Sequence, residues 1–383
     1  MSGNTTPASA TPRCPHFGVC GGCQFQDVAY AEQLRLKRTR LAELLHDAGL
    51  ATPEIAVRAA EPYEYRNRIR LRVEQINGAL RFGYNRSNTT EFLPIITCPI
   101  AAPVLWQTAE ALLAAAQTDD GATKCLVAAS HVELFCSDDL ALVQLTLLCE
   151  PRTAPPRGTF DRMMQALAAI TPRITSAAAV NYDSRTGLPG RTLESWGASG
   201  IAYRAADETY WISRGAFFQV NRFLIDALIQ LVCEGRSGSL AWDLFAGVGL
   251  FSRILARNFA QVTAVEANAA AVTDLRAALA RLGRAHQAVQ ATTLDFLRNA
   301  VVQRERPGLI VLDPPRAGAG AEACELLLRM AAPQMVYVSC DPSTLARDLV
   351  ALQPSYRIAA LHMVDLFPQT EHLETVVVLE RNS

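Results

Sequence analysis

The chain has 383 residues, of which 50% are hydrophobic, and this excludes a single small domain in favour of two domains or one domain with an insertion. A formal net charge of −1 excludes a globally polybasic protein, so a nucleic-acid partner would have to bind a local patch. The sequence contains no secretory leader and no run of about 18 apolar residues, so we expect a cytoplasmic protein without a membrane partner.

The N-terminal region joins a polar tail to a cysteine loop. Residues 1–13 are small and polar, and we predict that they form a disordered tail. The stretch CPHFGVCGGC follows, with Cys14, Cys20 and Cys23 among three glycines. The other seven cysteines are scattered singly through a long chain, which favours metal binding or thiol chemistry over a disulfide framework.

Residues 29–50 repeat apolar side chains at helical spacing up to Gly49, which predicts an amphipathic helix. Its basic residues are expected on or near the polar side of this helix: Arg35, Lys37, Arg38 and Arg40.

From about residue 55 to 212 the pattern changes to short alternating runs separated by turn signals, which predicts a mostly antiparallel sheet with a helix or two. The runs 65–73 and 81–88 interleave Arg with Tyr and Phe. That combination suits phosphate contacts and stacking on unpaired bases, while a strand with a solvated basic face is the alternative.

From about residue 213 apolar strand-like runs alternate with helical ones. This alternation predicts right-handed β-α-β units and a parallel, doubly wound sheet, which places the chain in the α/β class. The last two runs, 356–367 and 372–381, have no helix between them and are expected to form a closing hairpin. Ligands of such a sheet bind outside the C-terminal ends of its strands, so the functional residues should gather there.

The first of these strands ends in DLFAGVGLF, where Gly247 and Gly249 allow a tight turn and close approach of a ligand. Glu266 ends the next strand, where a carboxylate can bind two ribose hydroxyls. The loop lacks the third glycine of the dinucleotide fingerprint, which favours a nucleoside without a pyrophosphate. A plain strand-to-helix turn is the alternative.

Two later strands end in LDPPRAG and VSCDPSTLARD, which place Asp313, Arg316 and Cys340 at the expected pocket. Cys340 lies close to the start of a helix, whose dipole favours the thiolate, and it is a candidate nucleophile. The alternative is a buried structural cysteine. In DLFPQTEHLETV one carboxylate is a candidate general base, unless this segment is an exposed loop.

The motifs GAFFQVN, DLFAGVGLF, LDPPRAG, VSCDPSTLARD and FPQTEHLET occur in this order. Together they resemble the RNA 5-methyluridine methyltransferases, S-adenosylmethionine-dependent enzymes that act on uracil C5 in rRNA and tRNA. The resemblance extends from Cys14 to nearly the end of the chain and is nearest to the iron–sulfur enzymes of 23S rRNA. It implies a class I, Rossmann-like, seven-stranded methyltransferase domain with an inserted α+β RNA-binding domain that carries a four-cysteine loop.

The resemblance implies roles for individual residues. Cys340 would be the nucleophile that adds to uracil C6, which turns C4–C5 into an enolate able to accept a methyl group. Glu374 matches the general base that removes the C5 proton. Arg316 replaces the aromatic residue that amino-group methyltransferases carry in a similar motif, which argues against N-methylation. The positions expected to bind the cofactor are Gln219, Phe245, Gly247, Gly249, Glu266 and Asp313, with Thr292 and Leu250 as weaker candidates.

The cysteine loop belongs to the same resemblance, which implies a [4Fe–4S] cluster held by Cys14, Cys20, Cys23 and Cys98. Four thiolates bind zinc equally well, and spacing does not decide between the two. A radical S-adenosylmethionine enzyme is disfavoured, because the five residues between the first two cysteines differ from the spacing that such enzymes need.

We therefore expect three segments: a tail (1–13), an iron–sulfur and RNA-binding domain (14–25 and 52–212) and a methyltransferase domain (26–51 and 213–383). The expected reaction is methylation of uracil C5 in 23S rRNA by a monomer, with the target base flipped into the pocket. A tRNA methyltransferase and a non-catalytic RNA-binding protein are the alternatives. Since the N-terminal TRAM barrel of many relatives is lacking, RNA recognition should fall on Arg66, Arg68, Arg70 and Arg316.

Overall fold

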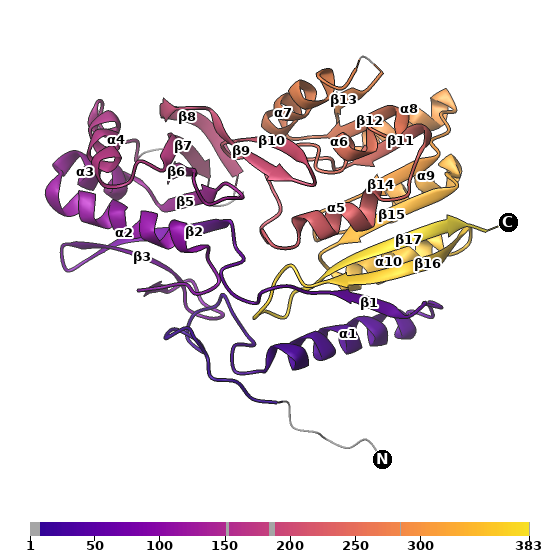
Figure 1. The fold of residues 1–383 in the computed structure, drawn as a ribbon, viewed down its shortest axis with the longest axis horizontal. Coiled ribbons are helices and arrows are strands. Elements are labelled where there is room, and N and C mark those ends of the chain that lie inside the picture. Colours follow the sequence, from indigo (N-terminus) through magenta and orange to yellow (C-terminus); the bar gives the residue numbers. More distant parts are fainter. Residues whose placement is uncertain (1–7, 151–152, 184–187, 284, 383) are drawn as a thin grey trace.

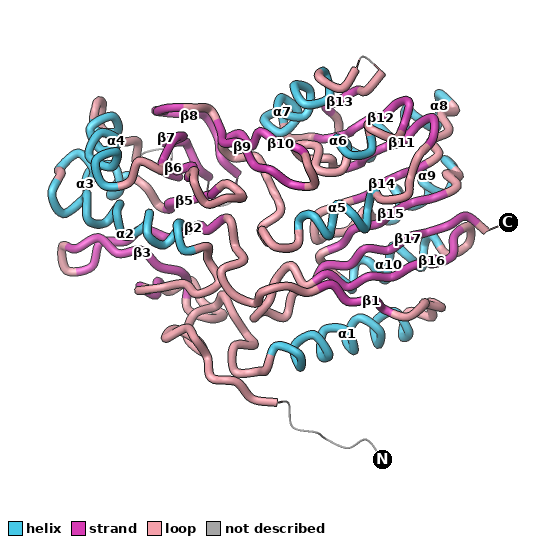
Figure 2. Tube along the Cα trace, in the orientation of Figure 1, coloured by secondary structure: helices cyan, strands magenta, loops and turns pink. Residues whose placement is uncertain are grey.

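The structure, a computed structural model, describes residues 8–150, 153–183, 188–283 and 285–382. Two large sheets lie side by side, one in each half of the molecule, and a short hairpin lies between them (Figures 1 and 2). None of the helices in these ranges combines the length and the apolar character needed to cross a membrane.

The larger sheet holds the predicted parallel unit. Its eight strands run in the order β1 (Ile55–Arg58), β16 (Tyr356–Val364), β17 (Glu374–Arg381), β15 (Gln334–Ser339), β14 (Leu309–Leu312), β11 (Gly238–Leu244), β12 (Phe259–Glu266) and β13 (Gln287–Gln290). Strand β17 is antiparallel to both of its neighbours, and the other pairs are parallel. The doubly wound α/β fold and the closing hairpin are thus confirmed.

Helices cover both faces of this sheet. One apolar core involves α1 (Tyr30–Asp47), α8 (Thr293–Gln303), α9 (Ala321–Met330) and α10 (Pro342–Leu352). The core on the other face involves α5 (Ile225–Cys233) and α6 (Ser252–Leu255), together with α7 (Ala269–Ala280). Burial of these two apolar layers is the main stabilising term for a sheet of this kind.

The smaller sheet has seven strands in the order β4 (Phe92–Pro94), β3 (Ala79–Asn85), β2 (Arg68–Ile76), β5 (His131–Cys136), β6 (Val143–Cys149), β7 (Ile174–Asp183) and β8 (Leu188–Gly197). All its pairs are antiparallel except β6 with β7. Its core is closed by α2 (Pro103–Thr118), α3 (Asp120–Ala128) and α4 (Thr159–Ile170).

Three features differ from the expectations. Strand β1 pairs with β16 and adds an eighth strand to the methyltransferase-type sheet, although residues 55–58 were predicted to belong to the other unit. The hairpin of β9 (Gly200–Ala205) and β10 (Glu208–Ser213) shares its core with α5 and α6. Residues 1–7 of the predicted tail lie outside the described residues, but Ala10 N donates to Asp27 O and Ala29 N to Ala8 O, so residues 8–10 are bonded to the segment before α1.

Candidate functional site

Strand register brings the sequence motifs to one edge of the larger sheet. Leu244 pairs with Leu312, and Leu312 pairs with Tyr337, so β11, β14 and β15 end close together. The antiparallel strand β17 begins at this same edge, where Thr375 pairs with Ser339. The residue after Ser339 and the residue before Thr375 are Cys340 and Glu374, which are therefore neighbours.

Three charged or titratable side chains surround Cys340 at this edge: Glu374, Asp313 and Arg316. Glu374 is buried, Asp313 and Cys340 are partly buried, and Arg316 is exposed. The Gln219 amide donates to Asp313 Oδ2 at 3.4 Å, and Arg316 Nη2 lies 3.4 Å from His372 Nε2. The site thus combines a thiol and two carboxyls with one guanidinium.

The charge states of these groups follow from burial. Burial raises the pKa of Cys340 to about 11, Glu374 and Asp313 raise it as well, and Arg316 opposes them. Burial and the neighbouring Asp243 raise the pKa of Asp313 to about 7. The pKa of Glu374 lies well above its usual value because of burial and Asp313. In the free protein at neutral pH, Cys340 is therefore a thiol, and burial favours the protonated form of Glu374.

Burial outweighs any effect of the helix start, so Cys340 is not a thiolate in the ligand-free protein at neutral pH. The Asp341 carboxylate caps α10 by accepting from Ser343 N and Thr344 N, each at 3.0 Å. Two of the amide groups that create the positive end of the helix dipole are thus already paired with an anion.

The glycine loop after β11 has the shape of a ligand cradle. Gly247 has φ +55° and no atom within 4 Å of the place where a Cβ would stand. Its amide donates to Glu266 Oε2 at 2.9 Å, and Asn268 N donates to Glu266 Oε1 at 2.7 Å. Phe245, also at positive φ, begins this loop. Glu266 is thus fixed beside the open side of the loop, and its oxygens keep lone pairs for ribose hydroxyls.

The two weaker cofactor candidates lie differently. Leu250 is buried in the core, and its carbonyl accepts from Tyr210 Oη at 3.0 Å. Thr292 caps α8, where its hydroxyl donates to Asp295 Oδ2 at 2.7 Å and accepts from Asp295 N at 3.1 Å. The hydroxyl of Thr292 is therefore engaged in the cap, and Leu250 offers only an apolar side chain.

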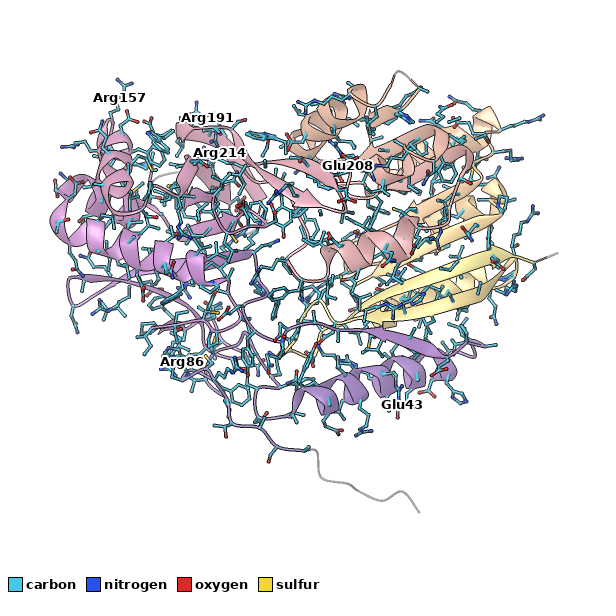
Figure 3. All side chains as sticks on the ribbon, in the orientation of Figure 1. Glu43, Arg86, Arg157, Arg191, Glu208 and Arg214 are labelled. Atoms are coloured by element: carbon cyan, nitrogen blue, oxygen red, sulfur yellow. The ribbon has the colours of Figure 1, made fainter. Side chains whose placement is uncertain are left out.

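The cysteine loop is attached to the smaller sheet. Gly21 N donates to Asn85 O, and Cys20 forms a β-bridge with Arg86 at the end of β3. A cavity of about 530 Å³ is lined by all four predicted ligands, with Arg66, Arg70, Arg72 and Arg86 on its walls; Arg86 is labelled in Figure 3.

The four thiols share this cavity without converging. Within the described ranges no three His, Cys, Asp or Glu side chains form a group that could hold a metal ion as they stand. Burial raises the pKa of Cys20 and Cys98, and that of Cys23 to about 11. The donor set suits a four-thiolate centre, but the sulfur atoms would have to move closer together and lose their protons to bind one.

The predicted RNA-binding arginines differ in their surroundings, although Arg66 and Arg70 both line the cysteine cavity. Arg70 and Arg68 pair with the buried Glu133 at 2.8 and 3.5 Å. The Arg68 guanidinium lies over the Phe135 ring, and Arg66 faces the cysteine cavity. Arg316 lies apart from these three, at the edge that holds Cys340.

The sequence did not predict the buried contacts between the 29–50 helix and residues 365–373, the loop before Glu374. Lys37 was expected near the polar side of its helix but is buried against Asp365, and Gln33 is buried against Gln369. The available signal was that Gln33 and Lys37 fall in line with the apolar residues Leu41 and Leu45 on one face of the helix. Buried polar groups need partners, so these two residues indicate a contact with another segment.

Comparison with known proteins agrees with this geometry. The family model for tRNA (Uracil-5-)-methyltransferase matches residues 201–382. The 23S rRNA (uracil(1939)-C(5))-methyltransferase RlmD of Chromohalobacter salexigens is 33% identical over 394 residues, which cover 99% of this chain and 78% of that protein. An RNA methyltransferase of Enterococcus faecalis is 29% identical and matches 97% of this chain and 84% of its own length.

The fold has a solved counterpart. The Pyrococcus abyssi tRNA (uracil-54, C5)-methyltransferase, in complex with S-adenosyl-L-homocysteine, superposes with a TM-score of 0.74 at 24% identity, covering 94% of this chain and 86% of that one. Fold, site edge and relatives agree that this chain belongs to the RNA 5-methyluridine methyltransferases, S-adenosylmethionine-dependent enzymes that methylate uracil C5 in RNA.

Proposed function

We propose that this enzyme methylates one uridine of 23S rRNA and that Cys340 forms a covalent adduct with the target uracil. The observation that carries the proposal is the register of β15 and β17, which makes Cys340 and Glu374 neighbours at the edge that also holds Asp313. A nucleophile beside a buried base is the arrangement that adduct formation and proton removal require.

The reaction begins at uracil C6. The Cys340 sulfur adds to C6, and the electron pair of the C5–C6 double bond moves to C5 and the C4 carbonyl as an enolate. The thiol proton must leave at this stage, and the nearby carboxylate of Asp313, with a pKa of about 7, is the acceptor in the site. Arg316 favours the thiolate, because its charge lowers the pKa of Cys340.

S-adenosylmethionine, when bound, would supply the methyl group, which C5 of the enolate takes with its electron pair as the bond between the methyl carbon and the positive sulfur breaks. Once C5 carries both the methyl group and its proton, Glu374 takes that proton, and the electron pair re-forms the C5–C6 double bond as the Cys340 sulfur leaves C6. Glu374 must be ionised for this step, and Arg316 favours that state by lowering the pKa of Glu374.

The cofactor would be held by the open glycine loop. Glu266 would bind its ribose hydroxyls, while Gly247 and Gly249 let it approach the backbone. Gln219 and Asp313, which are joined by a hydrogen bond, would line its path toward Cys340. Phe245 supplies an apolar face, and Leu250 and Thr292 remain weaker candidates.

For the RNA, we propose contacts by Arg70 and Arg316, with Arg66 and Arg68 in a supporting role behind them. The choice of 23S rRNA rests on the relatives named as 23S rRNA enzymes. A tRNA substrate is the second candidate, because the solved neighbour is a tRNA enzyme. We propose further that the enzyme is a monomer, and that residues 14–25 and 52–212, apart from β1 and the β9–β10 hairpin, form the RNA-binding domain.

We also propose that Cys14, Cys20, Cys23 and Cys98 hold a [4Fe–4S] cluster, with zinc as the alternative. The support is that all four line one cavity and that the loop carrying three of them is tied to β3. The thiols have to lose their protons on binding, so the adjacent Arg66 would stabilise the negative charge of the centre.

The decisive experiment supplies labelled S-adenosylmethionine with separate pools of 23S rRNA and tRNA and maps the label. Wild type should label one uridine of 23S rRNA at C5, and Cys340→Ala should label none. Cys324→Ala is the matched control, because Cys324 is buried in α9 away from this edge. Labelling of tRNA alone selects the second candidate, and methylation by Cys340→Ala excludes the covalent mechanism.

A further inference from the structure

The loop that precedes Glu374 contacts the helix that follows the cysteine loop in the sequence. We call residues 365–373 the Glu374 loop, since β17 begins with Glu374 directly after it. Tyr65 Oη donates to Pro368 O at 3.1 Å, and Thr370 Oγ1 donates to Phe367 O at 2.8 Å. The helix is α1, which passes under this loop at the edge of the sheet (Figure 1).

Three side chains on one side of α1 reach the Glu374 loop. Tyr30 Oη donates to Asp365 Oδ2 at 2.9 Å, and Lys37 Nζ lies 2.6 Å from Asp365 Oδ1 and 3.0 Å from Phe367 O. Gln33, between them in the sequence, bonds to Gln369. The spacing of three and then four residues is that of one helix face, so α1 presents a continuous polar stripe to the loop.

Gln33 and Gln369 are both buried in this contact, with exposures of 1% and 2%. Gln33 Oε1 accepts from Gln369 N, and Gln33 Nε2 lies 3.0 Å from Gln369 Oε1. Gln369 has φ +69°, a left-handed conformation that non-glycine residues rarely adopt. The buried amide pair therefore holds the loop in a conformation that its backbone alone disfavours.

The same two residues join the cysteine loop to the Glu374 loop. Gln369 O accepts from Gln24 N at 2.9 Å and from Phe25 N at 3.0 Å, directly after Cys23. Gln33 Nε2 also lies 2.8 Å from Phe25 O and from Val28 O. Gln26 Oε1 in turn accepts from Cys14 N at 3.0 Å. Hydrogen bonds thus connect Gln24 and Phe25, directly after Cys23, with the turn five residues before Glu374, and Gln26 in the same segment holds Cys14 N.

We propose that Gln33 is a positioning residue for Glu374, and that through Gln369 it makes the placement of this base depend on an ordered cysteine loop. Without the Gln33 amide, Gln369 loses its side-chain partner, and its backbone N–H is left buried without an acceptor. The turn at Gln369 then relaxes and Glu374 shifts against C5 of the bound uracil. Cys340 directly follows β15 and does not take part in this set of bonds, so addition at C6 stays intact.

The proposal rests on the covalent mechanism proposed above, and it predicts a step-specific defect. Gln33→Met keeps the length of the side chain and removes its hydrogen bonds. Because misplacement by about 1 Å costs on the order of 100-fold in rate, we expect kcat to fall by about 10- to 100-fold with KM for RNA unchanged. During turnover a protein–RNA adduct that resists denaturing gel electrophoresis should accumulate, since proton removal and release of Cys340 become slow.

Three further measurements make the outcome decisive. RNA that carries 5-fluorouridine at the target position traps each enzyme molecule that can add at C6, because fluorine replaces the C5 proton and a base cannot remove it. The amount of trapped adduct therefore measures the number of these molecules. Gln33→Met should trap as much of this RNA as wild type does. If wild type itself traps none, the covalent mechanism is wrong. Gln230→Met, the same change at an exposed position of α5, should leave kcat and adduct level unchanged.

If Gln33→Met does not fold, Gln369→Gly carries the test, because glycine adopts this positive φ without strain and only the side-chain bond is lost. It should show the same adduct accumulation in a milder form. The proposal is overturned if a folded variant, either Gln33→Met or Gln369→Gly, has the same kcat per trapped enzyme molecule as wild type and accumulates no additional adduct.

Discussion

Lys37 Nζ lies 2.6 Å from Asp365 Oδ1, and the two side chains are 1% and 0% exposed although 328 residues separate them in the sequence. This ion pair joins the first helix to the loop that leads into the last strand. Phe367 O and Tyr30 Oη complete the surroundings of the two charges. The pair is therefore compensated within the fold, which is the condition under which a buried charge persists.

Lys37→Met should destabilise the enzyme strongly, because it leaves the Asp365 carboxylate buried without its cation. The expected loss in the free energy of unfolding is about 3–5 kcal/mol, measured by urea unfolding. Lys37→Met with Asp365→Asn should recover a large part of it. The control Arg35→Met removes the solvent-screened pair with Glu32 and should leave the free energy of unfolding almost unchanged. Equal losses for the two single variants would contradict this account.

Methylation should speed up as pH rises above neutrality, since Cys340 has a pKa of about 11 in the free enzyme and the pKa of Glu374 is also raised. Both groups act in their ionised forms, and Arg316 lowers the pKa of both. Arg316→Gln should therefore move the rise of kcat/KM to higher pH and slow the reaction at neutral pH. The profile of Arg298→Gln, a change on exposed α8, should stay where it is. An unshifted Arg316→Gln profile would rule out this electrostatic role.

Asp243 should make the cofactor-free protein less stable as pH rises toward neutrality. Burial raises its pKa to about 7, and a hydrogen bond from Ser252 Oγ only partly offsets the shift. Between about pH 4 and pH 7 the folded chain holds a proton that the unfolded chain has released, so the free energy of unfolding falls with rising pH.

Asp243→Asn removes that titration, and its stability should fall less steeply between about pH 5 and pH 7, by about 1.4 kcal/mol per pH unit. Urea unfolding at several pH values measures the two slopes. Asp161→Asn, at an exposed position of α4, should keep the wild-type slope. Parallel curves for wild type and Asp243→Asn would show that Asp243 has an ordinary pKa.

The cysteine cavity predicts a bound centre in protein purified without oxygen. Visible iron–sulfur absorption, with iron and sulfide in the protein, is the expected result, and Cys98→Ser should lose it. Cys125→Ser changes a buried cysteine of α3 and should keep the centre. A colourless protein with stoichiometric zinc would replace the cluster by the zinc alternative, and a metal-free, fully active protein would exclude both.

Arg70 should contribute to RNA affinity through one phosphate contact. It is the most exposed of the three arginines predicted along this segment, although it pairs with Glu133. Arg70→Ala should weaken binding and reduce the slope of log affinity against log salt by about 1. Filter binding at several salt concentrations measures this, with Arg298→Ala as the control. An unchanged slope would remove Arg70 from the RNA contact.

Residue patterns along the chain were enough to predict the class of fold and the edge of the sheet that carries the chemistry. Alternating apolar strands and helices imply a parallel sheet, and the ends of parallel strands meet at one edge. For this reason the sequence pattern predicts that Glu266, Asp313 and Cys340 lie together at that edge. These patterns are local, and local periodicity with chain direction is enough to predict them.

Only the tertiary structure decided which polar groups are buried and what they face. The helical pattern of residues 29–50 set Lys37 near the polar side, yet a partner 328 residues away holds it inside. The raised pKa of Cys340 likewise depends on desolvation and on Glu374 from another strand, which outweigh the local effect of the helix start. Burial and long-range charge arise when distant segments pack together, so residue spacing along the chain does not encode them.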